Sequence, residues 1–163
     1  METTLQNLLT QISAITKKDD VKKELLEKLI HDLHNICKDH CDLKKDGDLL
    51  IKWGGFYFEP EGWKHYAIGF SFDKDWANNC FYGIRKKNME DTNIPVHITK
   101  IMDDKLRNMM DDINEKWPRA RYFEPFDWWY NNELWIEIAK GEMARKIWGK
   151  VKEILSEFEN EKL

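Results

Sequence analysis

The sequence predicts an α+β domain in which an antiparallel sheet of three or more strands is flanked by helices. Apolar residues recur at helical spacing near both ends of the chain, they alternate with period two in the middle, and the middle strands are joined by connections too short for crossover helices. A chain of 163 residues is long enough for one domain with a sizeable core. We therefore expect a single domain over residues 1–163, made of a helical hairpin (1–45), a β-meander (49–87) and a helical, aromatic-rich part (97–163).

The N-terminal part predicts two helices. Thr4–Thr16 carries leucine and isoleucine three and four residues apart, which is the spacing of an amphipathic helix. A second helix is expected from Asp20, as its N-cap, to about Asp42, because its apolar residues again share one stripe. The short link between the two predicts a helical hairpin, and the charged residues 44–48 predict the loop that leads onward.

The middle of the chain predicts a three-stranded meander. Leu49–Trp53 alternates with period two, and the strand resumes at Phe56–Phe58 after a glycine pair that suggests a bulge. A Glu-Pro-Glu-Gly turn leads to a second strand, Tyr66–Phe72, with aromatic and isoleucine side chains on one face and small ones on the other. Cys80–Arg85 is the expected third strand.

The C-terminal part predicts two further helices. The apolar residues between Ile98 and Trp117 share one stripe, and Pro118 is expected to end that helix. Residues 119–132 are irregular and rich in aromatic side chains, and residues 133–140 fit either a short helix or a strand. Glu142–Glu159 has a clear amphipathic pattern and predicts the last helix.

Composition favours a cytoplasmic protein with free thiols. The chain has no apolar run near the roughly 20 residues that span a bilayer and does not begin with a signal-peptide pattern, so no membrane association is expected. Cys37, Cys41 and Cys80 cannot all pair, which disfavours a disulfide framework. With 26 basic and 30 acidic residues the net charge is −4, which disfavours a general nucleic-acid coat protein.

The sequence offers little support for catalysis. Asp42-Leu43-Lys44 and Asp103-Asp104-Lys105 have the acid-x-lysine spacing of metal-dependent nucleases, but they are expected at a helix end and on a solvated helix face rather than on a strand. Glu133 and Glu137 form an acidic pair of a kind common on surfaces. No glycine-rich phosphate loop is present, so no nucleotide cofactor is expected and no catalytic residue is assigned.

One cluster has the spacing of metal ligands. His31, His34, Cys37 and Cys41 lie three and four residues apart on the predicted second helix, where they could face one another around zinc. The cysteines, however, fall on or beside the apolar stripe, where a free cysteine behaves as a small buried hydrophobe. We therefore expect no metal site, and a metal-dependent enzyme is the least favoured class.

The chain is unusual in its tryptophan content. The eight tryptophans are Trp53, Trp63, Trp76, Trp117, Trp128, Trp129, Trp135 and Trp148. Trp53, Trp117 and Trp148 continue predicted apolar faces and are expected in the core. Trp76, Trp128 and Trp129 fall outside those faces, and with Arg119 and Arg121 nearby they have the composition of an interface hot spot. These five residues predict a partner-binding surface; the alternative is that the rings cap a sheet edge or fill a second small core.

A nucleic-acid interface is the second hypothesis. It would use the same aromatic side chains to stack on bases, with Arg85, Lys86 and Lys87 on the backbone. Residues 49–88 hold 6 basic and 4 acidic side chains, a local charge of +2. This asymmetry is too small to favour nucleic acid over a protein partner.

Aromatic and glycine residues from Trp53 onward follow a recognisable order. They are Trp53, Gly55-Phe56-Tyr57-Phe58, Trp63, Tyr66–Phe72 and Tyr82-Gly83-Ile84, then Trp117, the Trp128-Trp129 pair and the helix after Gly141. This order, over about 110 residues, resembles the C-terminal accessory region of bacterial PD-(D/E)XK nuclease superfamily proteins. Those proteins carry their nuclease core upstream, where this chain has only the Leu5–Asp42 helices, so no catalytic residue is carried over. The resemblance implies an accessory module from a phage, mobile-element or defence setting.

Taken together, the sequence favours a small non-enzymatic module that binds another protein as an inhibitor, immunity or regulatory factor. It would act by occupying its partner sterically, with an acidic surface and aromatic anchors. The identity of the partner and the oligomeric state are left open.

Overall fold

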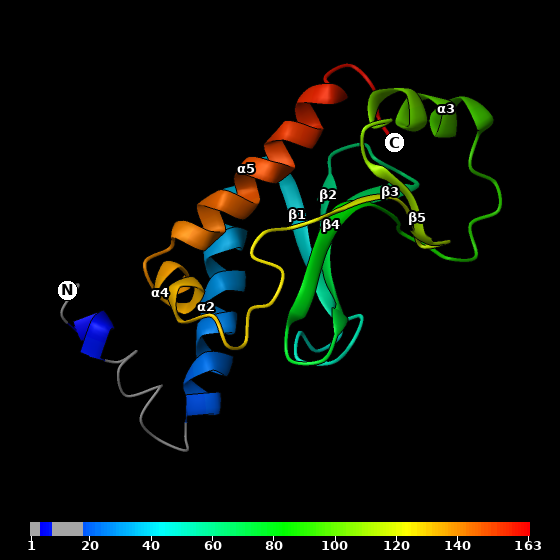
Figure 1. The fold of residues 1–163 in the computed structure, drawn as a ribbon. Helices are drawn as coiled ribbons and strands as arrows, with labels where there is room; N and C mark the ends of the chain where they lie inside the picture. Colours follow the sequence, from blue (N-terminus) through cyan, green and yellow to red (C-terminus); the bar gives the residue numbers. More distant parts are fainter. Residues whose placement is uncertain (1–3, 8–17) are drawn as a thin grey trace.

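The computed structural model describes residues 4–7 and 18–163, with the backbone alone for Lys18 and residues 110–113. Its strands are β1 (Cys41–Asp46), β2 (Gly55–Pro60), β3 (Tyr66–Lys74), β4 (Asn78–Lys86), β5 (Met110–Asn114) and β6 (Trp117–Tyr122). They form one six-stranded sheet in the order β1-β2-β3-β4-β6-β5, and every neighbouring pair is antiparallel (Figure 1). The predicted α+β class with an antiparallel meander is confirmed.

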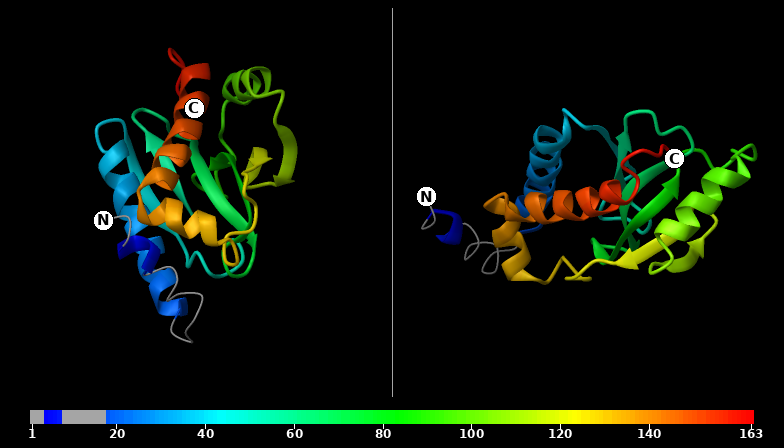
Figure 2. Two further views of the ribbon diagram at one scale, coloured as in Figure 1. Left: turned by 60° about the vertical axis from the view of Figure 1, so that its left-hand side comes forward. Right: turned by 90° about the horizontal axis from the view of Figure 1, so that it is seen from above.

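The helices gather mainly on one face of the sheet. They are α2 (Lys18–Cys37), α3 (Val96–Lys105), α4 (Asn132–Ala139) and α5 (Glu142–Glu157). Figures 1 and 2 show α2, α4 and α5 packed together beside the sheet, with α3 at its far end near β5. The main core lies between the sheet and these helices, and we call this side of the sheet the helix-bearing face.

The helix-bearing face of the central strands is built from aromatic rings in register. Phe56 of β2 pairs with Phe70 of β3, which pairs with Tyr82 of β4. The successive ring centroids lie 5.4 and 5.2 Å apart, and the rings are nearly parallel. Cross-strand aromatic pairs of this kind stabilise a sheet. The predicted strands at Tyr66–Phe72 and Cys80–Arg85 are confirmed within β3 and β4.

The second helix is shorter than expected. α2 ends at Cys37, and residues 41–46 form the edge strand β1, which pairs with β2 from Cys41↔Pro60 to Asp46↔Gly55. The prediction of a helix to Asp42 followed by a loop at 44–48 was therefore wrong, because charged residues are well tolerated on an edge strand that faces solvent. The helix also begins before Asp20, which lies in its first turn and is not its N-cap.

The predicted strand Leu49–Trp53 is a loop. Asp48 stabilises its start, because a carboxylate oxygen of Asp48 accepts a hydrogen bond from the backbone N–H of Leu50 at 2.9 Å. Leu49 is buried while Ile51 and Trp53 are exposed, so these three side chains do not share one face as a strand would require. Trp53 has a φ of 71°, in the left-handed region, which turns the chain into β2.

The predicted helix from Ile98 to Trp117 is a helix followed by a β-hairpin. α3 ends at Lys105, and β5 and β6 follow. Apolar residues keep a helical spacing as far as Trp117, but this spacing does not determine the structure there. The pairing of β6 with β4 makes these residues a strand. Pro118 does not end a helix; it stands opposite the register shift between Asp111 and Asn114, where the missing N–H of a proline is tolerated.

The C-terminal helices agree with the sequence. The segment 133–140, which fitted a helix or a strand, is helical in α4 up to Ala139, with Lys140 as the C-cap. A side-chain oxygen of Asn131 caps the start of this helix by accepting the N–H of Leu134 at 3.1 Å. α5 begins at Glu142 as predicted and ends at Glu157. Residues 8–17, and with them most of the predicted Thr4–Thr16 helix and hairpin, lie outside the described residues. Among the described residues, no helix is both long and apolar enough to cross a bilayer.

Candidate functional site

Two of the predicted aromatic anchors lie in the core. Trp128 is fully buried, and its ring meets Phe72 edge-on at 4.8 Å. Trp129 is 4 % exposed and packs edge-on against Trp135 at 5.9 Å. Both rings belong to the main core between the sheet and the helices, and not to a sheet edge or a second small core. Neither ring offers a surface to a partner.

The segment that carries these tryptophans is fastened to two other parts of the chain. The side-chain oxygen of Asn78 accepts hydrogen bonds from the N–H groups of Trp128 and Trp129 at 3.1 and 3.3 Å. The buried ammonium of Lys22, on α2, donates to the carbonyl of Trp129 at 2.6 Å and lies 4.6 Å from its ring. Trp76 is 47 % exposed and packs on Trp129 at 4.9 Å, so it is the one predicted aromatic anchor that is accessible.

The two predicted arginines lie apart from Trp76. Arg119 and Arg121 pair in register with Ile84 and Tyr82, on the helix-bearing face, whereas Trp76 lies in the turn between β3 and β4. Arg119 bonds to Asp103 of α3 at 3.0 and 3.1 Å and so ties that helix to β6. The five predicted residues therefore do not form one surface.

The basic residues of the nucleic-acid hypothesis are largely occupied within the protein. Arg85 is buried, donates to Asp46 at 2.6 Å and stacks on the ring of Tyr57 with its guanidinium carbon 4.1 Å from the centroid. The ammonium of Lys87 donates to the carbonyl of Trp63 and lies 3.5 Å from Glu59. Lys86 is partly buried. These side chains do not form an open basic patch.

The opposite face of the sheet is the most unusual surface of the molecule. None of the described helices packs on it, and its central row is formed by Tyr57, Gly69, Gly83 and Ala120 on four adjacent strands. The small residues leave room for the flat ring of Trp117. A Cβ atom on Gly69 would lie 2.5 Å from Cη2 of that ring. This face is therefore built to hold an aromatic ring directly on the backbone.

Around Trp117 the aromatic rings form two contacting groups that meet at one register pair of β4 and β6. Trp117 meets Phe81 edge-on at 4.9 Å, and both are buried in a small core separate from the helix-side core. Trp53 contacts Phe81 at 6.2 Å. Tyr122, which pairs in register with Phe81, contacts Phe126 at 5.8 Å. We define the aromatic face as Trp53, Phe81, Met89, Trp117, Tyr122 and Phe126.

The rim of the aromatic face is open to solvent. Tyr122 is 39 % exposed, Phe126 42 %, Trp53 43 % and Met89 47 %. Trp53, Met89 and Trp117 also line a shallow pocket of about 400 Å³. An exposed apolar patch of several adjacent side chains is typical of an interaction site, whereas scattered apolar side chains on a surface are normal.

The charges beside the aromatic face are paired. Asp46 accepts hydrogen bonds from Arg85 at 2.6 Å and from Lys116 at 2.8 Å. Burial raises the pKa of Asp46, but the hydrogen bonds and positive charges of Lys116 and Arg85 outweigh it, so the pKa lies below its ordinary value of 3.8. Lys52 lies 5.4 Å from the ring of Trp53. The surroundings of the face are mixed in charge and not strongly basic.

Sequence reasoning missed the aromatic face, although a signal was present. Trp53 and Trp117 were expected in the main core, and Met89, Tyr122 and Phe126 were not singled out. The signal was the alternation in β3, where Ala67, Gly69 and Ser71 share the face opposite the large side chains. A run of small residues on one face of a central strand indicates that something flat packs there.

The candidate motifs for catalysis and metal binding gain no support. Asp42-Leu43-Lys44 lies on the edge strand β1 and not at a helix end, but Lys44 is paired with Glu59 at 3.2 Å. Over residues 4–7 and 18–163, no three His, Cys, Asp or Glu side chains are arranged to hold a metal. Burial raises the pKa of the Cys41 thiol to about 12 and also raises that of Cys37, which disfavours their thiolates.

Comparison with known proteins gives no relative from which a site could be transferred: no family model, no curated protein and no solved structure matches the chain.

Proposed function

We propose that this protein is a module that binds another protein through its aromatic face. The observation that carries the proposal is the apolar rim of Trp53, Met89, Tyr122 and Phe126, each 39–47 % exposed, on a sheet face that none of the described helices covers. Aromatic side chains and methionine are the residue types enriched at protein interfaces.

The arrangement of the face favours tight contact. Phe81 and Trp117 form a buried floor, and the exposed rings stand around it. A rim supported by such a floor loses little conformational freedom when a partner binds, which lowers the cost of association. Rings of this kind are the usual hot spots of an interface.

The charges support a protein partner over a nucleic acid. Arg85 and Lys116 are both bonded to Asp46, so both cations next to the rings already have a partner within the chain. Nucleic-acid binding depends on clustered basic side chains that are available to phosphates. The overall charge of −4 works in the same direction.

The proposed action is steric: the module covers a surface that its partner needs, as an inhibitor, immunity or regulatory factor does. The resemblance to accessory regions of PD-(D/E)XK nuclease proteins suggests a phage, mobile-element or defence setting for that partner. Trp76 lies outside the aromatic face and is treated as a separate candidate anchor.

The test is affinity capture from host lysate, with and without added nuclease, using matched variants. We expect a protein that wild type retains after nuclease treatment to be lost by the double variant Trp53→Ala and Tyr122→Ala, with the dissociation constant of the purified pair raised by about tenfold or more. Tyr130→Ala is the control, because Tyr130 is 81 % exposed and lies outside the aromatic face. Circular dichroism checks that each variant is folded.

Three outcomes would contradict the proposal. Equal capture by the wild type and the double variant would show that the aromatic face is not the interface. Loss with Trp76→Ala alone would place the interface at the β3–β4 turn. Capture that disappears when nucleic acid is digested would favour the nucleic-acid hypothesis.

A further inference from the structure

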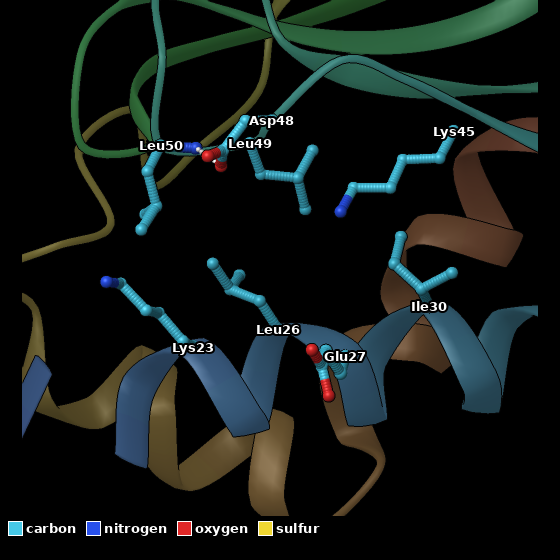
Figure 3. Close-up of a pocket in the computed structure, with 8 residues that line it drawn as sticks. All are labelled: Lys23, Leu26, Glu27, Ile30, Lys45, Asp48, Leu49 and Leu50. Atoms are coloured by element: carbon cyan, nitrogen blue, oxygen red, sulfur yellow. Dashed lines mark hydrogen bonds between the residues drawn. The ribbon is translucent and has the colours of Figure 1, made fainter. Parts of the chain in front are cut away.

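A pocket lies on the helix-bearing side of the molecule, between α2 and the loop that follows β1. Its volume is about 410 Å³, which is within the range of small-molecule sites. Figure 3 shows the lining residues: Lys23, Leu26, Glu27, Ile30, Lys45, Asp48, Leu49 and Leu50. This pocket is not part of the aromatic face.

The centre of the pocket is apolar. Leu26 and Ile30 rise from α2 toward Leu49 and Leu50 of the loop (Figure 3). Leu26 and Leu49 are buried and belong to the main core, while Ile30 and Leu50 are half-buried and pack against it. The pocket floor is therefore supported by the core, and its walls suit an alkyl or aryl group.

An ammonium group stands at each end of this apolar centre. Lys45 pairs in register with Phe56, which directs its side chain to the helix-bearing side, and in Figure 3 its ammonium points into the pocket. Lys23 lies at the other end, beside Leu50. Within the described part of the chain, neither ammonium takes part in an ion pair or hydrogen bond, unlike Lys28, which bonds to Asp32 at 2.6 Å.

Among the residues that the structure describes, no ion pair within 4 Å joins Asp48 or Glu27, the two acidic side chains of the pocket, to either ammonium group. Asp48 uses a carboxylate oxygen to accept the N–H of Leu50 at 2.9 Å. Glu27 turns its carboxylate away from Leu26 and Ile30 (Figure 3). The four charged side chains of the pocket sum to zero, but both ammonium groups stand beside the apolar surface without a carboxylate within ion-pair distance.

We propose that this pocket binds a small amphipathic carboxylate, a molecule with one carboxylate and an alkyl or aryl tail. The carboxylate pairs with Lys45 at one end of the pocket, and the tail lies on Leu26, Ile30 and Leu49. A charge-assisted hydrogen bond supplies orientation, and burial of the tail supplies most of the affinity. The inference is independent of protein binding by the aromatic face.

The test uses octanoate as the probe and the full chain, followed by calorimetry and by amide chemical shifts. We expect saturable binding, with shifts concentrated in residues 23–30 and 45–50. Lys45→Met keeps an unbranched apolar stem but removes the ammonium group and its charge, and it should weaken binding by about tenfold. Lys28→Met is the matched control on the same helix and should leave binding unchanged, because Lys28 does not line the pocket.

Two further probes separate the parts of the proposal. Acetate has the charge without the tail, and octan-1-ol has the tail without the charge; both should bind at least about tenfold more weakly than octanoate. Equal affinity of wild type and Lys45→Met for octanoate would overturn the proposal. So would shifts centred on the aromatic face, or an affinity for octan-1-ol equal to that for octanoate.

Discussion

The two faces of one sheet differ in how they are covered. On the helix-bearing face, β2, β3 and β4 present the stacked rings of Phe56, Phe70 and Tyr82, each at most 2 % exposed. One residue along, the same three strands present Tyr57, Gly69 and Gly83 to the other side. There a single ring, Trp117, takes the place of the helices. The same strands therefore carry a layer of helices on one face and only the ring of Trp117 on the centre of the other.

We expect the helix-bearing face to determine the stability of the protein and the aromatic face to determine its binding. Large side chains on the helix-bearing face are surrounded by other core residues, so substitutions there should act mainly on the free energy of unfolding. The aromatic face keeps its rim in water, so truncation of the rim should act mainly on binding. The following predictions test that division, beginning with the largest effect on stability.

Phe70→Ala should be the most damaging change. Phe70 lies at the centre of the helix-bearing face, with ring contacts to Phe56, Phe58, Tyr82 and Phe123. Removal of a fully buried phenylalanine leaves a cavity and costs about 3–5 kcal/mol of unfolding free energy. Urea unfolding followed by circular dichroism measures this loss. A loss below about 1 kcal/mol would mean that this face is not the main core.

Gly69→Ala should have an intermediate effect, on the opposite side of the same strand. The added methyl group would meet the ring of Trp117 at 2.5 Å and the Cδ of Arg85 at 3.1 Å. Overpacking of this kind costs about 1–3 kcal/mol, and near-ultraviolet circular dichroism should report the displaced indole.

The control is Gly149→Ala on α5, where the new methyl group meets nothing within 4 Å. It should stabilise the protein by roughly 0.5–1 kcal/mol, because alanine is the better helix former. If Gly69→Ala did not lower the free energy of unfolding, the close packing of the Trp117 ring on Gly69 would be refuted.

Asp46→Asn should have a smaller effect than Phe70→Ala or Gly69→Ala, and one that depends on pH. The pKa of Asp46 is lowered in the folded protein, so its contribution is present above the ordinary value of 3.8 and is lost as the pH falls through the lowered value. At pH 7 we expect a loss of about 1–2 kcal/mol, less than for a fully buried pair because Asp46 is partly exposed.

The measurement is urea unfolding of wild type and Asp46→Asn from pH 7 down to pH 2. The difference between the two should shrink once the pH drops below 3.8 and should disappear below the lowered pKa. Asp104→Asn, an exposed position on α3, serves as the comparison. A difference that stays constant over this range would argue against the ion pairs of Asp46 with Arg85 and Lys116.

The strands and helices that could be predicted from the sequence are those whose apolar residues have a regular local spacing. The alternation in β3 and β4 and the stripe of α5 are visible residue by residue, and both are confirmed. β1 and the β5–β6 hairpin were missed because their strand conformation depends on partners far away in the sequence. Lys44 and Lys45 resemble loop residues until β2 supplies their hydrogen bonds.

The candidate sites depend even more on long-range contacts. Trp53 and Trp117 meet Phe81 only when a loop and a hairpin close on the same face of the sheet. Lys23 and Lys45 share a pocket only because α2 lies across the start of the meander. Trp128 and Trp129 resembled surface anchors because their segment has no regular periodicity, yet Asn78 and Lys22 hold it in the core.

The distribution of the tryptophans gives the protein its own optical reporter. Six of the eight indoles are at most 8 % exposed, whereas Trp53 and Trp76 are 43 % and 47 % exposed. A water-borne quencher such as iodide should therefore reach these two and leave the emission of the other six largely unchanged. Replacement of Trp76 by phenylalanine would leave a single quenchable indole, and that indole stands on the aromatic face.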